Sequence, residues 1–259
     1  MSCKDKDYLK ATLKGITPQE GPVISFVALH IHQHADHIIV DRHGYVRKFI
    51  EKQDPRCKSK SIVHPIKLNA TDNVESPPLP EHSITSPIME MRYLDDVRPD
   101  IKFATSFLTM RMSKPTVALK EQADYHLNYL GSSNDLFIRI APSNDQIHAY
   151  NDAFYAIHTD SLSHYGLAIS LGDSGYAFHS KSSPIKTVCR SSTEAEIHAA
   201  NEACSDVLHA VDLLTEIDHL QKPVVFYEDN QAVFSLILNS TTRPSQNMFA
   251  CDMTFLKSK

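Results

Sequence analysis

Three acidic residues in the C-terminal half of the sequence have the types and spacing of a metal-binding set. Asp152 lies at the end of a predicted strand, Glu196 lies near the start of a long amphipathic helix, and Asp229 follows a short apolar strand. Carboxylates from a first strand, a central helix and a later strand of one sheet can hold two Mg²⁺ ions about 3.5–4 Å apart, as two-metal phosphodiester hydrolysis requires. Oxygen ligands are those that Mg²⁺ prefers.

The start of the long helix also offers a purely structural role for Glu196. Its sequence contains the S/T-x-x-E capping box twice, as Ser191 with Glu194 and as Thr193 with Glu196. In a capping box the glutamate reaches back to a free backbone amide. The helix signals alone therefore leave two roles open for Glu196, a capping residue or a metal ligand.

The other two acids have structural alternatives as well. Asp229 or Asn230 could cap the helix that follows the strand, because both residue types favour that position. A single aspartate such as Asp152 is most often a turn residue. Each structural role is plausible singly, but the three carboxylates together favour a metal site.

Two further candidate sites carry less weight. Tyr93-Leu94-Asp95-Asp96 imitates the Y-x-D-D of polymerase active sites, and we interpret the match as coincidental. His30, His32 and His34 alternate along one strand, with His37 just beyond, so three imidazoles could share a face and bind zinc. Since no cysteine or carboxylate recurs there at metal spacing, we expect a histidine-rich hairpin without metal.

The elements that must position the three acids form an alternating pattern. Strands are expected near residues 136–140 and 147–152, and residues 165–171 should pair with 175–180. A helix over 193–217 carries apolar residues at spacings of three and four, and a strand at 223–228 and a helix from 230 follow. Antiparallel strands, a helix, a further strand and another helix predict an α/β sheet domain.

The preceding residues form three segments. Residues 24–31 are expected to form one buried strand that pairs with residues 37–40 across a polar turn, with a helix from about residue 43. Residues 69–86 are polar, contain Ser76-Pro77-Pro78-Leu79-Pro80, and indicate a linker. Residues 87–131 should be helical, with Pro115 separating two helices.

Composition excludes several classes of protein. The chain has 259 residues, of which 42% are hydrophobic, and no apolar run approaches the ~20 residues of a membrane helix. Five cysteines without a CxxC pair indicate reduced thiols in the cytoplasm or nucleus. Residues 1–60 carry a net charge of +4, whereas residues 145–259 carry −7, which a solvated acidic surface or a carboxylate metal site would explain.

A family resemblance rests on specific strings. Ser191-Ser192-Thr193-Glu194-Ala195-Glu196 with Asp229-Asn230-Gln231 resembles the RNase H region of copia-type retrotransposon polyproteins, and Tyr150-Asn151-Asp152-Ala153 resembles that family's Y-S-D-A strand. Arg98-Pro99-Asp100-Ile101 resembles the connection between polymerase and RNase H. The hairpin with Gly44-Tyr45 resembles the piece just after the polymerase active site.

The resemblance implies a division into four parts. These are a reverse transcriptase palm/thumb remnant at 1–68, a linker at 69–86, a helical connection at 87–144 and an RNase H-like domain at 145–259. That last domain would be a mixed sheet flanked by helices, after a small α+β remnant and the helical connection. The polymerase aspartates would precede residue 1, so polymerase activity is not expected.

The resemblance also implies a reaction. Asp152, Glu196 and Asp229 match the family's metal-binding carboxylates and would position two Mg²⁺ (or Mn²⁺) ions to hydrolyse the RNA strand of an RNA–DNA hybrid. The partners would be that hybrid and the remainder of a Pol polyprotein, with no membrane involved.

The sequence departs from the family at several positions. Phe154 and Tyr155 stand where the family has an aspartate and a tryptophan, and Phe249-Ala250-Cys251-Asp252 replaces its K-H-I-D segment. We expect the closing strand and helix, with the fourth carboxylate, to be missing, and hydrolysis to be impaired. Asp252 is a weak substitute. The alternative is a catalytically inactive remnant that binds nucleic acid or protein.

Overall fold

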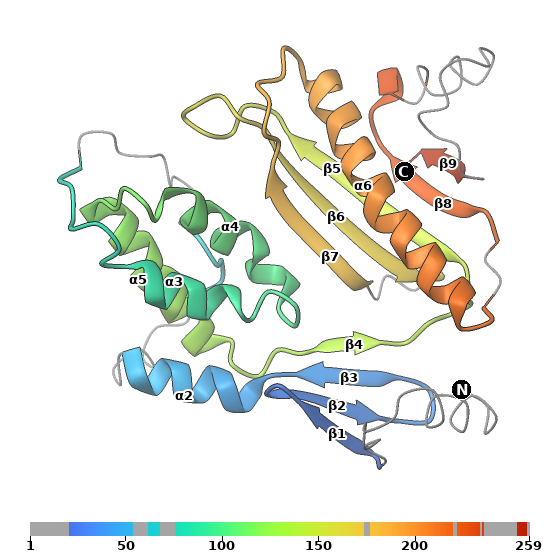
Figure 1. Cartoon of the computed structure of the whole chain (residues 1–259), viewed down its shortest axis with the longest axis horizontal. Coiled ribbons are helices and arrows are strands. Elements are labelled where there is room, and N and C mark those ends of the chain that lie inside the picture. The colour runs from blue at the N-terminus through green and yellow to red at the C-terminus, as the bar shows by residue number, and fades with distance from the viewer. Residues whose placement is uncertain are drawn as a thin grey trace.

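The computed structural model describes residues 21–53, 62–67, 76–173, 177–219, 222–233 and 235, together with the backbone of 253–257. It contains two sheets and a group of helices between them in the chain (Figure 1). One sheet has the order β1-β2-β3-β4 and the other has the order β7-β6-β5-β8-β9. The fold is therefore mixed α/β, as the sequence predicted.

The first sheet is built from β1 (Val23–Phe26), β2 (Leu29–Gln33), β3 (Ile38–Asp41) and β4 (Ile138–Ile140), all antiparallel. The prediction of one buried strand over residues 24–31 was wrong. Val27 and Ala28 form a tight turn at φ 47° and 60°, and Phe26 and Val27 are largely exposed. The pairing across the turn before β3 was predicted correctly.

The helices are α2 (His43–Gln53), α3 (Thr85–Arg92), α4 (Lys102–Arg111) and α5 (Val117–Ser132), with a short 3-10 turn at Pro99–Ile101. Buried side chains of all four α-helices share one hydrophobic core. The Thr116 hydroxyl caps α5 by accepting from Leu119 N at 3.2 Å. This helix and α4 follow the predicted periodicity and the break at Pro115.

The described part of the predicted linker is packed. The backbone N–H of Leu79 donates to Pro115 O at 2.8 Å, and that of Val117 donates to Pro77 O at 2.9 Å. Ile84 is buried, and α3 begins at Thr85, inside the range assigned to the linker. The linker prediction is therefore wrong for residues 76–86, because their backbone groups pair with the start of α5. Residues 69–75 lie outside the described residues.

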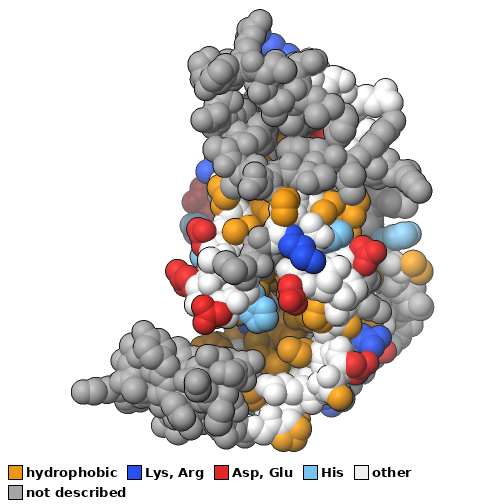
Figure 2. All heavy atoms as spheres, turned by 90° about the vertical axis from the view of Figure 1, so that its right-hand side faces the viewer, with side chains coloured by type: hydrophobic (Ala, Val, Ile, Leu, Met, Phe, Trp, Pro, Cys, Tyr) orange, Lys and Arg blue, Asp and Glu red, His pale blue; other side chains and the backbone are white. Residues whose placement is uncertain are grey.

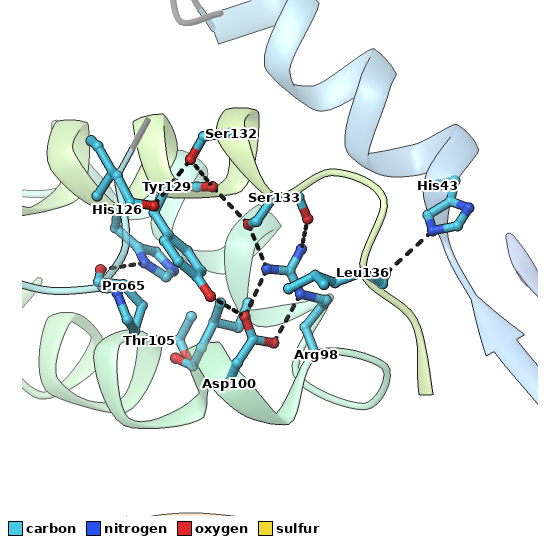
Figure 3. A network of polar contacts seen from close by, with 12 residues as sticks. His43, Pro65, Arg98, Asp100, Thr105, His126, Tyr129, Ser132, Ser133 and Leu136 are labelled. Carbon is cyan, nitrogen blue, oxygen red and sulfur yellow. Dashed lines mark hydrogen bonds and ion pairs between the residues drawn. The ribbon is translucent and has the colours of Figure 1, made fainter. Parts of the chain in front are cut away.

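A buried ion pair ties the connecting segment to α5 (Figure 3). The guanidinium of Arg98 donates to both carboxylate oxygens of Asp100, at 2.9 and 2.7 Å, and to the carbonyl and hydroxyl oxygens of Ser133. Tyr129 donates its hydroxyl to the same aspartate at 2.7 Å. The segment around Arg98, which resembles the connection of the family, therefore has a structural role: it fixes the chain before α4 to the end of α5.

The second sheet combines β5 (Ile147–Phe154), β6 (His164–Leu171) and β7 (Ala177–Pro184) in an antiparallel arrangement, with β8 (Val224–Glu228) parallel to β5. The long helix α6 (Ser192–Glu216) packs its alanine-rich face on this sheet. Helix α4 lies against β7 from the other part of the chain. The predicted strands near residues 147–152, 165–171, 175–180 and 223–228 and the helix over 193–217 are thereby confirmed. The strand predicted near residues 136–140 is β4, and its assignment to this sheet was wrong, because it pairs with β3 of the first sheet.

The last described strand corrects one expectation. Residues Met253–Lys257 form β9, which pairs in parallel with β8. We expected the closing strand to be missing; that expectation is wrong, because β9 pairs with the backbone edge of β8. The helix predicted from residue 230 lies mostly outside the described residues, although residues 231–233 are helical.

Candidate metal centre

The three predicted acids come together at one end of the second sheet. One carboxylate oxygen from each of Asp152, Glu196 and Asp229 lies within 4.8 Å of the other two. Asp152 belongs to β5, Glu196 to the first turns of α6, and Asp229 directly follows β8. In the part of the chain that the structure describes, this is the one group of three or more acidic, histidine or cysteine side chains close enough to share a metal ion.

The cap of α6 is formed without Glu196. The Ser191 hydroxyl accepts from the backbone N–H of Glu194 at 3.2 Å, and the Glu194 carboxylate accepts from Arg190 N at 2.6 Å. Of the two capping boxes in the sequence, the structure uses the first residue pair. Glu196 is consequently left free for another role.

The same division of roles occurs after β8. The side chain of Asn230 accepts from the backbone N–H groups of Ala232 and Val233, at 3.0 and 3.3 Å. Asn230 therefore caps the following turn, and Asp229 stays exposed beside Glu196.

Asp152 is a strand residue rather than a turn residue. It lies opposite Gly166 on β6, and a side chain at this glycine would meet no atom within 4 Å. Because strand partners present their side chains on the same face, the glycine leaves open space beside Asp152. The carboxylate of Asp152 is itself exposed.

Glu196 differs from the other two acids because it is buried. Only 6% of its surface is exposed, and its Oε2 has no hydrogen-bond partner among the residues that the structure describes. Burial and then the negative charges of Glu228, Asp152 and Asp229 raise the pKa of Glu196 to about 8. A buried carboxylate oxygen without a donor, facing two exposed carboxylates, suits a divalent cation with oxygen ligands.

A fourth carboxylate, which the sequence analysis missed, lies close to Glu196 on the buried side of the site. Glu228 is 1% exposed and precedes Asp229 at the end of β8. Burial raises the pKa of its carboxyl group. The only signal in the sequence was an acidic residue ending an apolar strand, and strand register was needed to place it. The other candidate, Asp252, lies outside the described residues.

The string Tyr93-Leu94-Asp95-Asp96, which matches the Y-x-D-D of polymerases, does not belong to this group of acids. Asp95 accepts a hydrogen bond from the Thr105 hydroxyl at 2.7 Å, and its pKa is raised to about 6 by burial. Leu94 is fully buried, whereas Asp96 is exposed. These residues connect the turn after α3 to α4, a structural role.

The histidines of the first sheet have individual partners. His32 pairs with Asp41 at 2.8 Å and His37 with Asp36 at 2.7 Å, while the ring of His34 stacks on that of His37. His30 contacts the Ser25 hydroxyl at 3.1 Å. Carboxylates do reach two of these imidazoles, which the sequence spacing did not suggest.

Comparison with known proteins identifies the class. No protein-family model matches the chain. It is 31% identical over 202 residues to the retrovirus-related Pol polyprotein from transposon RE2 of Arabidopsis thaliana, covering 73% of the chain and 14% of that protein. For the corresponding polyprotein from transposon RE1, the identity is 31%, over 65% of the chain and 12% of the polyprotein. An uncharacterised mitochondrial protein of the same plant is 29% identical over 69% of the chain and 75% of its own length.

These relatives make the chain a retrotransposon-derived protein. More particularly, it belongs with the copia-type Pol polyproteins, as the strings around Glu196 and Asp229 had indicated. The aligned region spans roughly an eighth of the two polyproteins, at 14% and 12% of their lengths. Among the described residues, no helix is both long and apolar enough to span a membrane.

Proposed function

We propose that residues 145–259 form an RNase H-like domain that hydrolyses the RNA strand of an RNA–DNA hybrid with two Mg²⁺ or Mn²⁺ ions. The observation that carries this proposal is the convergence of three carboxylates within 4.8 Å around a buried, unpaired Glu196 oxygen. The relationship to Pol polyproteins supplies the substrate class, since such elements copy RNA into DNA.

The protein's own residues divide the work. Glu196 presents a fixed, buried ligand atom, and the exposed Asp152 and Asp229 lie at the surface where a phosphate can approach. The cations, when bound, would activate a water molecule and neutralise the phosphate. The open space beside Gly166 allows the substrate backbone to come near Asp152.

One face of the domain beside the candidate site carries more acidic than basic side chains. The described side chains seen in Figure 2, on the side of β8 and the end of α6, include scattered acidic groups with few basic ones between them. Since Lys and Arg contacts normally supply phosphate affinity, we expect binding of the hybrid to require the divalent ions.

The test is cleavage of a hybrid with labelled RNA by the purified chain in Mg²⁺. We expect RNA cutting that is abolished in Asp229→Asn and retained in Asp212→Asn, a matched change at an exposed aspartate on α6. A folded chain that cuts nothing, in Mg²⁺ or Mn²⁺, would refute the proposal and favour a non-catalytic remnant.

A further inference from the structure

A pair of buried polar side chains lies next to the candidate metal centre, and the proposed function does not use it. Asn151 precedes Asp152 on β5, and Glu228 precedes Asp229 on β8. Their exposed fractions are 8% and 1%. Buried polar groups of this kind need partners, and those partners show what the pair holds together.

The strand register places the two side chains opposite each other. Tyr150 pairs with Tyr227 in the parallel ladder, so the next residue on each strand is Asn151 or Glu228. Two residues earlier, Ala149 and Phe226 are buried in the core beneath α6. Because side chains alternate along a strand, Asn151 and Glu228 point to the same covered face.

The hydrogen bonds of Glu228 join the two strands that carry the exposed acids. Its Oε2 accepts from Asn151 Nδ2 at 3.4 Å, and its Oε1 accepts from the backbone N–H of Asn230 at 2.9 Å. The first bond ties the residue before Asp152 to the residue before Asp229. The second fixes the backbone on either side of Asp229, between residues 228 and 230.

We propose that Glu228 and Asn151 form a positioning pair, which holds Asp152 and Asp229 at the separation needed to bind cations with Glu196. This inference rests on the proposed function. In metal sites, residues that orient the ligands typically change metal affinity about 10–100-fold when they are removed. Glu228 acts through its two hydrogen bonds and is not itself a ligand.

The hydrogen bonds of the pair allow the effect of the lost contacts to be separated from the effect of the lost charge. Asn151 Oδ1 has no partner among the described residues, and in the natural pair it is Asn151 Nδ2 that donates to Glu228. With the Asn151 amide turned over by 180°, a glutamine at position 228 can donate its Nε2 to that oxygen and still accept from Asn230 N. Glu228→Gln therefore retains both ties but removes the charge. Glu228→Ala removes the ties and the charge together.

The experiment measures Mn²⁺ affinity by electron paramagnetic resonance on the whole chain, with folding checked by circular dichroism. We expect Glu228→Ala and Asn151→Ala each to weaken binding about tenfold or more, and Glu228→Gln to bind like the unsubstituted protein. The two alanine changes should be non-additive in the double variant, since each breaks the same tie.

The outcomes separate the two proposals. Unsubstituted protein that binds no Mn²⁺ would overturn the proposed function and, with it, this inference. Normal binding in the unsubstituted protein and in both alanine variants would overturn the positioning pair alone. Equal losses in Glu228→Ala and Glu228→Gln would also overturn it, because the charge would then be what matters. If Glu228→Ala does not fold, the smaller change Asn151→Ala decides.

Discussion

His126 on α5 should make the helical core sensitive to acid. The ring is fully buried and stacks on Tyr129, and its Nδ1 donates to the carbonyl of Pro65 at 2.8 Å (Figure 3). Within the described part of the chain, its Nε2 has no partner. Burial lowers the pKa of this imidazole from 6.5 to about 4, with the nearby Arg98 charge acting in the same direction. The folded protein therefore holds His126 neutral.

The sign of the effect follows from proton binding. Between pH 6.5 and 4 the unfolded chain binds a proton at this position that the folded chain does not, so the free energy of unfolding falls as the pH falls. The difference between 6.5 and about 4, at about 1.36 kcal/mol per pH unit, amounts to about 3 kcal/mol lost between pH 7 and pH 4.

The assay is urea unfolding at pH 7, 6, 5 and 4, comparing the unsubstituted chain with His126→Asn. The asparagine amide can donate to the Pro65 carbonyl but does not titrate. We expect the variant to be less stable at pH 7, because it fills less of the core, and to lose about 3 kcal/mol less on acidification. His209→Asn, at an exposed position on α6, is the matched control. Parallel pH profiles for His126→Asn and the unsubstituted chain would refute this reasoning.

Four further changes have defined expectations. Asp95→Asn should stabilise the protein by about 1 kcal/mol at pH 7, because burial raises the pKa of Asp95 to about 6 and stability is lost as the pH rises from about 4 through 6; urea midpoints at pH 4 and 7 test this, and no gain at pH 7 would contradict it. Ser191→Ala should cost about 1 kcal/mol through the lost cap of α6, with Ser192→Ala as the control in thermal unfolding. Arg98→Lys should cost about 3 kcal/mol, since lysine cannot reproduce the paired contacts to Asp100 and Ser133, and an unchanged urea midpoint would contradict that. Mn²⁺ at about 100 times its Kd should raise the free energy of unfolding by about 2.7 kcal/mol, and Glu196→Gln should remove most of that gain; equal metal stabilisation of both proteins would exclude Glu196 as a ligand.

Local signals predicted much of the second sheet's framework. The apolar spacing of three and four and the Ser191 cap defined α6, and short apolar runs defined β5, β6 and β8. These features depend on neighbours within a few residues, which is why the sequence contains them. The same holds for α5, with its Thr116 cap and the preceding Pro115.

The wrong predictions concern contacts between distant residues. Residues 24–31 are mostly apolar, with only Ser25 and His30 polar. Nothing in Val27 or Ala28 indicates a turn, since neither residue type favours positive φ. Strand β4 joins the first sheet by pairing with β3, about a hundred residues earlier in the chain. Residues 76–86 have a polar composition, yet they pack because α5 offers backbone partners.

The metal centre shows why spacing alone left each acid with two interpretations. A capping role and a ligand role require the same residue types at the same end of a helix, so the sequence could not choose between them. The structure distinguishes them because the caps are already occupied: Glu194 and Asn230 perform the capping. Glu196 is then a buried carboxylate with an unpaired oxygen, a costly arrangement that folded proteins retain mainly at sites that bind or react. The candidate site is therefore defined by the acids that the helix caps do not use, and matching a sequence pattern does not by itself place an acid in it.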